Sequence, residues 1–512
     1  MIPFIEHFPI LIVVISLLSS VTILVVGWIN RKASYFIFIT TIVTQFVASI
    51  FLLAHVLTRG PIRYWLGGWK PPWGIEYVVD ALNAYVLVIL LFLAFVCGIY
   101  SKKKREHELP QKVVSFYSVF QLLITGLCGV TVTGDIFNMY VFIEIMSIAA
   151  YALIGSMGKI GKVALKASFT YLVLGSVGAC FFLIGIGLLY SVTGSLNMHD
   201  LSLLLPPLYG NRVVQAAFAF FIVGLSIKMA LFPLHTWLPD AHAFAPAEIS
   251  AMLSGIIIEV STYAFIRVSF SVFTINFLRL LPILDILCWV AGGAIIAGSL
   301  MAITQMNLKR MLAYSSVANM GYIMLAVGLS ISVTSEPWNG LTPALMHILN
   351  HALMKGCLFL VAGAFIYKAD LWLINDFRGL GRRMPYTCAA FVVAAISMIG
   401  IPPSVGFVSK LYIVLAAIEA KKIVFVAIIL LSSLLNLVYF WRVIETMYMK
   451  RAEGEEHSTS THVSKDEAPF GMLAPILILA SLCIIMGFFW LAKVPMPILN
   501  QINNMFGLVK VP

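Results

Sequence analysis

Residues 221–246 read FIVGLSIKMALFPLHTWLPDAHAFAP, an apolar run that carries a lysine and is interrupted by proline. Lys228 stands five residues before Pro233. Proline has no backbone N–H and frees a carbonyl group of the preceding turn, which the membrane interior tolerates only where protein or water satisfies it. The stretch therefore predicts a membrane-spanning helix that is broken next to a buried charge.

A second stretch with the same features, SMIGIPPSVGFVSKLY, occupies residues 397–412. Pro402 and Pro403 lie in the middle of the apolar run, and Lys410 follows them. Broken helices at matching positions in two halves of a chain are typical of transport sites built from inverted repeats. The two stretches together predict a membrane protein with a transport-related site.

The composition supports this class. The chain has 512 residues, of which 61% are hydrophobic and 11% are charged. Soluble domains carry about 25% charged residues, and a single soluble core stops growing near about 250–300 residues. A soluble enzyme and a nucleic-acid-binding protein are therefore excluded. The net charge of +11 is compatible with basic loops in the cytoplasm.

Fourteen apolar runs approach the length of about 20 residues that a bilayer crossing needs. They start near residues 8, 34, 78, 113, 134, 163, 211, 247, 280, 308, 340, 386, 423 and 469. Lys and Arg concentrate in alternate loops, and cytoplasmic loops are the basic ones. We therefore expect a multi-pass protein of the cell membrane whose basic loops are cytoplasmic and whose two termini lie outside.

The two interrupted runs are the seventh and the twelfth, so they cross the membrane in opposite directions. This parity fits two inverted five-helix repeats. The predicted fold is an all-α polytopic bundle of about 14 helices, with helices 7 and 12 discontinuous. Its predicted parts are helices 1–3 (1–110), a first repeat of helices 4–8 (111–272), a second repeat of helices 9–13 (273–450), a cytoplasmic loop (451–468) and helix 14 (469–512).

Several ionisable residues fall inside or near the ends of these runs. A charge at the bilayer centre costs at least about 2.5–3.5 kcal/mol, so such groups face a protein interior or a wet cavity and mark ion or proton paths. Arg267 and Arg442 lie close enough to helix ends to reach the membrane surface. The remaining residues are Glu144, Lys228, Glu259, His347, His351, Lys355 and Lys410.

Four long motifs resemble one known family. They are WLPDAHAFAP (237–246), NLKRMLAYSSVANMGYIML (307–325), HILNHALMKGCLFLVAG (347–363) and GLGRRMPYT with GIPPSVGFVSK (379–410). The similarity is to the antiporter-like membrane subunits, which occur in Mrp-type cation/proton antiporters, where the D polypeptide is one of them, and in complex I, membrane-bound hydrogenases and sulfur reductases. It extends over residues 80–450 and implies a polar axis of charged residues along the membrane midplane.

The resemblance assigns positions on this axis. They are Glu144 in the fifth helix, Lys228 in the seventh, His347, His351 and Lys355 in the eleventh, and Lys410 at the exit half-channel of the twelfth. Complex I members carry glutamate at the last position. Lys410, together with a chain too short for a long lateral helix, favours the Mrp and hydrogenase branch.

One position departs from the family pattern. The eighth helix of the family usually carries a central lysine, where this chain has Glu259 within SGIIIEVSTYAFIR. Two interpretations follow. Either the relay is interrupted at this point, or Glu259 serves as an acidic relay group or sodium ligand.

A Glu–Lys pair of this kind can act as a switch. A charge partner at about 4 Å contributes about 4 kcal/mol at an effective dielectric constant of 20, so moving Glu144 away would favour release of the Lys228 proton. His347 and His351 share a helix face at a spacing of four residues. His235, Asp240 and His242, near the broken seventh helix, are candidates for proton uptake or for stabilising a loop.

No phosphate-binding loop, nucleophile motif or ligand set for a metal or cofactor is present in the sequence, so we expect no catalytic chemistry and no cofactor in this chain. The predicted function is proton translocation within a multisubunit Mrp-type cation/proton antiporter or a related redox-driven pump. Its expected partners are other membrane subunits, the lipid bilayer, protons and, as an open alternative, Na⁺. The competing hypothesis is a structural subunit that anchors partners without conducting ions.

Overall fold

The computed structural model describes residues 4–108, 111–156, 161–450 and 466–508. Nearly all regular structure is helical. The first part of the chain contains η1 (Phe4–His7), α1 (Phe8–Ile29), α2 (Arg31–Arg59), β1 (Ile62–Trp65), η2 (Leu66–Gly68), β2 (Glu76–Val79), α3 (Ala81–Glu108), α4 (Val113–Val132), α5 (Ile136–Gly155), α6 (Gly161–Thr193), α7 (Met198–Leu204), η3 (Pro206–Leu208), α8 (Arg212–Lys228) and α9 (Leu238–Phe244).

The second part continues in the same manner. It contains α10 (Ala247–Met252), η4 (Leu253–Ile257), α11 (Ile258–Ile266), η5 (Arg267–Val272), α12 (Thr274–Leu280), α13 (Ile283–Thr304), α14 (Leu308–Leu329), α15 (Thr342–Ala369), η6 (Ile374–Phe377), α16 (Leu380–Arg383), α17 (Pro385–Ile399), α18 (Val405–Glu419), α19 (Ile423–Tyr448), α20 (Phe470–Leu491) and α21 (Met496–Met505). The elements α10 to η5 form one span, in which η4 and η5 are π-helical.

Within the described residues, twelve helices are long and apolar enough to cross a membrane. The two remaining predicted runs are the broken ones. In the first, α8 ends at Lys228 and α9 begins at Leu238. In the second, α17 ends at Ile399 and α18 begins at Val405. The all-α polytopic class and both interruptions are thus confirmed, whereas the inverted-repeat symmetry and the domain boundaries stay predictions.

The predicted cytoplasmic loop 451–468 lies largely outside the described residues. Its last residues are described, and Asp466 forms ion pairs with Lys368 at the end of α15 and with Arg383 of α16. The Lys368 hydrogen bond, together with Arg383, lowers the pKa of the exposed Asp466 carboxyl below its usual value. These contacts join the described end of the loop to the bundle.

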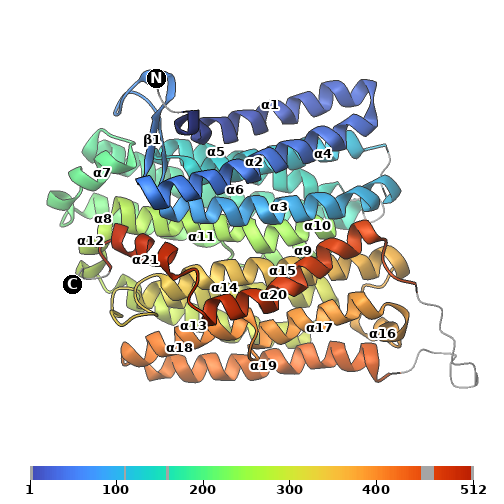
Figure 1. The fold of residues 1–512 in the computed structure, drawn as a ribbon. Helices are drawn as coiled ribbons and strands as arrows, with labels where there is room; N and C mark the ends of the chain where they lie inside the picture. The colour runs from blue at the N-terminus through green and yellow to red at the C-terminus, as the bar shows by residue number, and fades with distance from the viewer. Residues whose placement is uncertain (1–3, 109–110, 157–160, 451–465, 509–512) are drawn as a thin grey trace, which may run out of the picture.

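The long helices lie side by side in one bundle (Figure 1). Buried residues make up 100% of the most apolar stretch of Ala247–Val272 and 94% of that of α15, but only 33% of that of α19. A helix that is buried all round belongs to the interior of a bundle, whereas α19 leaves apolar side chains for lipid. The interior helices are therefore the ones that can hold charged groups away from lipid.

The strands β1 and β2 form a short antiparallel hairpin, in which Ile62 pairs with Val79 and Trp65 with Glu76. This hairpin was not predicted from the sequence. It lies at the same end of the bundle as α7, α12 and both chain termini (Figure 1). We call this the hairpin end; by the predicted orientation it faces the outside of the cell.

Candidate functional site

The first charged pair of the site joins α8 to α5. The ammonium nitrogen of Lys228 lies 3.2 Å from Oε1 of Glu144 and donates to the hydroxyl of Ser147 at 2.8 Å. Lys228 is the last residue of α8, and its side chain is only 3% exposed. An ammonium group in this position needs both partners, because burial without them would be costly.

The break that follows is satisfied by local contacts. The indole nitrogen of Trp237 donates to the carbonyl oxygen of Ile227 at 2.9 Å, and the amide of Leu231 donates to the carbonyl oxygen of Ser226. Pro233 in the intervening segment cannot continue the helical hydrogen bonding. The end of α8 thus stays open around Lys228 without leaving these carbonyl groups unpaired.

Glu259 and His351 form a second pair at the centre of the bundle. Oε1 of Glu259 lies 2.5 Å from Nδ1 of His351, although the two residues are 92 positions apart. Both side chains are buried. Among the described residues, neither Oε2 of Glu259 nor Nε2 of His351 has a hydrogen-bond partner. The π-helical segment η4 ends two residues before Glu259, and such segments are frequent at functional sites.

One helix, α15, carries the middle of the site. His347, His351 and Lys355 follow one another at intervals of four, so they lie on one face. The rings of the two histidines are stacked with centroids 6.5 Å apart. Nδ1 of His347 lies 2.9 Å from Oγ of Ser409 and its Nε2 lies 3.0 Å from Oδ1 of Asn319.

Lys355 is held by polar groups of α14. Its ammonium donates to the carbonyl oxygen of Leu312 at 2.7 Å and to the hydroxyl of Ser315. Within the described residues, no His, Cys, Asp or Glu completes a group of three that could hold a metal ion. The chemistry available along α15 is therefore proton binding and hydrogen bonding by lysine, histidine and hydroxyl groups.

Lys410 lies beside the second break. It is buried, and its ammonium donates to the carbonyl oxygens of Met398 at 2.8 Å and Ile399 at 3.2 Å. The ring of Tyr322 lies 4.9 Å away. No carboxylate of the described residues forms an ion pair with Lys410, so backbone oxygen atoms and an aromatic ring take the place of an acidic partner.

The three candidates for proton uptake have different surroundings. Asp240 pairs with Arg310 at the surface. His242 is fully buried and stacked on Phe359 at 4.6 Å, and among the described residues neither ring nitrogen has a hydrogen-bond partner. His235 is 5% exposed and packs near Tyr314. These residues do not form one cluster.

The site therefore consists of two parts. Glu144 and Lys228 form the first, and the groups from Glu259 to Lys410 form the second. Among the described residues, no direct hydrogen bond connects Lys228 with Glu259. A proton that moved between the parts would need water or a rearranged side chain.

One buried acid was missed in the sequence. Glu248 is fully buried, with its Oε1 at 2.6 Å from Nε of Arg105 and its Oε2 at 3.8 Å from Nζ of Lys104. The signal in the sequence was an acid shortly after Pro246, at the start of an apolar helix. Lys104 and Arg105 stand in a basic run that is typical of a loop, but their side chains fold back against this carboxylate.

The two arginines expected to reach the membrane surface differ. Arg442 is partly exposed and donates to the carbonyl oxygens of Ile303 and Gln305. Arg267 is only 7% exposed and forms a bidentate ion pair with Asp80 at 2.7 and 2.8 Å. For Arg267 the expectation was therefore wrong, because a carboxylate from a distant part of the chain is available inside the protein.

This architecture, a polytopic helical bundle with a buried row of lysine, histidine and glutamate at two broken helices, defines a class of ion-translocating membrane subunits. Comparison with protein families gives the narrower assignment. Residues 133–436 match the model of the NADH:quinone oxidoreductase/Mrp antiporter transmembrane family. The chain belongs to this family.

Curated relatives fall in two groups. The chain is 43% identical to the N polypeptide of the NADH-quinone oxidoreductase of Desulforudis audaxviator, over 94% of this chain and 96% of the relative. It is 30% identical to the D polypeptide of the Na⁺/H⁺ antiporter of Alkalihalophilus pseudofirmus, over 87% of each chain. Both kinds of relative are similar along most of their length.

Solved structures share the fold. A chain of the archaeal membrane-bound sulfane sulfur reductase matches with a TM-score of 0.86 and 32% identity, covering 97% of both chains. A chain of the Mrp complex of a Dietzia species matches with a TM-score of 0.86 and 24% identity, covering 98% of both chains. This chain is therefore an antiporter-like membrane subunit of the kind found in such assemblies.

Proposed function

We propose that this chain translocates protons along the buried row from Glu144 to Lys410, as one subunit of a multisubunit membrane complex. The Lys228–Glu144 ion pair carries the proposal. At about 4 Å and an effective dielectric constant of 20, such a pair contributes about 4 kcal/mol to the charged form of the lysine. Separation of the two groups would favour release of the proton, and their return would reload the lysine.

Glu259 acts in this proposal as an acidic relay group. Its contact with His351 supports this role over an interruption, because a carboxylate and an imidazole at 2.5 Å can exchange a proton. His347 and its contacts to Asn319 and Ser409 extend the row toward α18. Lys410, which follows directly after Ser409, is the last group and the proposed point of exit.

The complex that this chain serves is inferred from its relatives. The similarity to an NADH-quinone oxidoreductase polypeptide and to a sulfane sulfur reductase chain supports a redox-driven ion pump. The similarity to a Na⁺/H⁺ antiporter polypeptide supports an Mrp-type antiporter instead. Proteins that copurify with the chain distinguish the two, because only the first assembly contains redox-active partners. In both, we place the chain in the cell membrane with its hairpin end and termini outside.

A second candidate function is a structural subunit that holds partners without conducting ions. The separation between Lys228 and Glu259, which no direct hydrogen bond among the described residues closes, favours it. Under this alternative the buried charges would stabilise helix packing only.

Proton flux into vesicles that contain the assembled complex tests the proposal. We expect Lys228→Ala and Glu144→Gln to reduce driven flux by tenfold or more, since a loss of about 1.4 kcal/mol corresponds to tenfold in rate. Lys422→Ala, at a lysine that pairs with Asp285 on α13 away from the row, is the control. Unchanged flux in both test variants, with the complex intact, would favour the structural alternative.

A further inference from the structure

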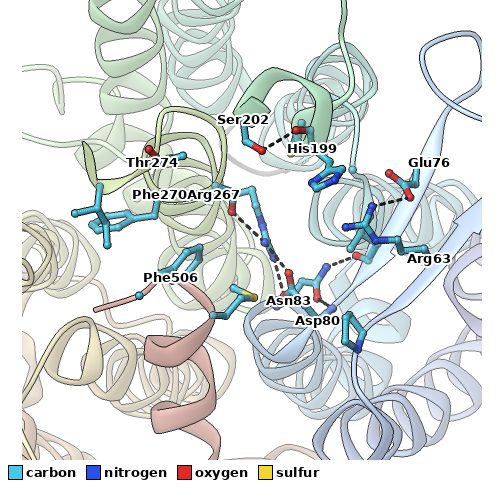
Figure 2. A pocket seen from close by; sticks show the side chains of 18 of the residues that line it. Arg63, Glu76, Asp80, Asn83, His199, Ser202, Arg267, Phe270, Thr274 and Phe506 are labelled. Carbon is cyan, nitrogen blue, oxygen red and sulfur yellow. Dashed lines mark hydrogen bonds and ion pairs between the residues drawn. The ribbon is translucent and has the colours of Figure 1, made fainter. Parts of the chain in front are cut away.

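A cavity opens at the hairpin end of the bundle, away from the row of residues described above. Its volume is about 620 Å³, and it is lined by the β1–β2 hairpin, the start of α3, α7, η5, α12 and the end of α21. Figure 2 shows Arg267 reaching from η5 to Asp80 at the wall of this cavity, with Arg63 and Glu76 on the hairpin opposite. The cavity gives solvent at the hairpin end access to the Asp80–Arg267 pair.

The Asp80–Arg267 pair is saturated with hydrogen bonds. The guanidinium donates to both carboxylate oxygens of Asp80 at 2.7 and 2.8 Å. The backbone amides of Leu82 and Asn83 donate to the same carboxylate. A bidentate pair of this geometry is rigid, and arginine keeps its charge at all physiological pH values.

The pair connects with the proton row through one helix face. Glu259, Tyr263, Arg267 and Ser271 follow one another at intervals of four, which on a helix places them along one side. Glu259 and Arg267 are separated by a rise of about 12 Å along the axis. Nε of Arg267 donates to the hydroxyl oxygen of Tyr263 at 3.3 Å. Along this face, only Tyr263 and the ion pair lie between Glu259 and the cavity.

Tyr263 closes the intervening space. It is fully buried, and its hydroxyl donates to the backbone carbonyl of Thr131 on α4 at 2.7 Å. The hydroxyl proton is therefore directed at α4 and away from Glu259, whose Oε2 has no partner among the described residues. A proton moving between the cavity and Glu259 would have to pass a fixed positive charge and displace a satisfied tyrosine.

We propose that Tyr263, Arg267 and Asp80 form a proton seal that separates Glu259 from the cavity at the hairpin end. The inference rests on the proposed function, since a seal matters only if Glu259 carries protons. Without it, Glu259 would exchange protons directly with the cavity, and part of the driven flux would be lost before it reached Lys410. The fixed guanidinium charge excludes hydrated protons, and the bidentate carboxylate holds the guanidinium in place.

Passive proton leak tests the seal without requiring driven transport. The variant Asp80→Asn/Arg267→Gln removes both charges together, so that neither is left buried without its partner. Vesicles containing the assembled complex receive a membrane potential from K⁺ and valinomycin, and an internal pH dye reports proton entry. We expect the leak to rise by tenfold or more over the unaltered complex. Adding Glu259→Gln should return it to the original rate, because the leak passes through that carboxylate.

Arg279→Gln is the matched control. Arg279 lines the same cavity from α12 and is exposed, and no ion pair is formed by it among the described residues. Its variant should leak no more than the unaltered complex. An unchanged leak in the double variant would overturn the seal, and so would a raised leak that persists in the triple variant, because it would indicate a general packing defect.

A labelling measurement covers the case in which the double variant does not assemble. Ser271→Cys should react with a membrane-impermeant maleimide, because Ser271 lines the cavity, whereas Thr262→Cys beyond the pair should not. Reaction of both cysteines at similar rates would overturn the seal. Loss of driven flux in the Lys228 variant is a separate readout, so failure of the proposed function and failure of the seal are distinguishable.

Discussion

The ammonium nitrogen of Lys410 lies 2.8 Å from the backbone carbonyl oxygen of Met398, one residue before the end of α17. The break between α17 and α18 leaves carbonyl groups at the C-terminus of α17 without helical donors. A helix C-terminus also attracts a positive charge. The interruption of the helix thus supplies the partners that allow a lysine to stay buried, and it joins the two features that the sequence stretch 397–412 displays.

Replacing Lys410 with methionine should abolish this arrangement at similar side-chain length. We expect driven proton flux to fall by about tenfold or more, because the last proton-binding group of the row is lost. Flux in vesicles with the assembled complex is the measurement, and Lys421→Met, at an exposed lysine after α18, serves as the control. Equal flux in the two variants would exclude Lys410 from the path.

Lys228→Arg separates charge from proton release. Arginine keeps the positive charge and can pair with Glu144, but it does not give up its proton in proteins. We therefore expect assembly to be retained and driven flux to be lost. Blue-native electrophoresis reports assembly and a pH dye reports flux. Retention of both would indicate that the ion pair serves packing alone.

Glu259→Lys restores the residue type that the family resemblance leads one to expect. It would place an ammonium group against His351, on a helix face that already carries Lys355. We expect flux to decrease about tenfold or more, because the acidic partner of His351 is replaced by a like charge. Increased flux would instead support the view that Glu259 interrupts the relay. Glu259→Gln, which removes the charge without adding a cation, distinguishes repulsion from loss of the acid.

Glu248→Gln tests the buried acid that was missed in the sequence. It removes the carboxylate that Arg105 and Lys104 contact, and breaking a buried ion pair typically costs about 3–5 kcal/mol. Thermal unfolding of the purified complex, followed by loss of the intact band, should shift to lower temperature. Glu445→Gln breaks an exposed contact with Lys450 and should change stability by less than about 1 kcal/mol. A similar shift in both variants would contradict the structural role of Glu248.

The amino-acid sequence by itself determined the class of protein, the two broken helices and most of the charged residues of the site. These features are local. Hydropathy is a property of about 20 consecutive residues, proline removes a hydrogen bond at its own position, and a lysine inside an apolar run is visible without knowing its partner. The pairing of Lys228 with Glu144 followed from the family resemblance, and the ion pair in the structure agrees with it.

Only the tertiary structure decided which distant groups meet. The contacts of Glu259 with His351, of Glu248 with Arg105 and of Asp80 with Arg267 each join separate elements, over as many as 187 positions for the last. Such a contact depends on which helix faces turn toward one another, and nearly uniformly apolar helices carry little periodic signal for that choice. The same reason explains why Arg267 was expected at the membrane surface, although a carboxylate 187 positions earlier holds it inside.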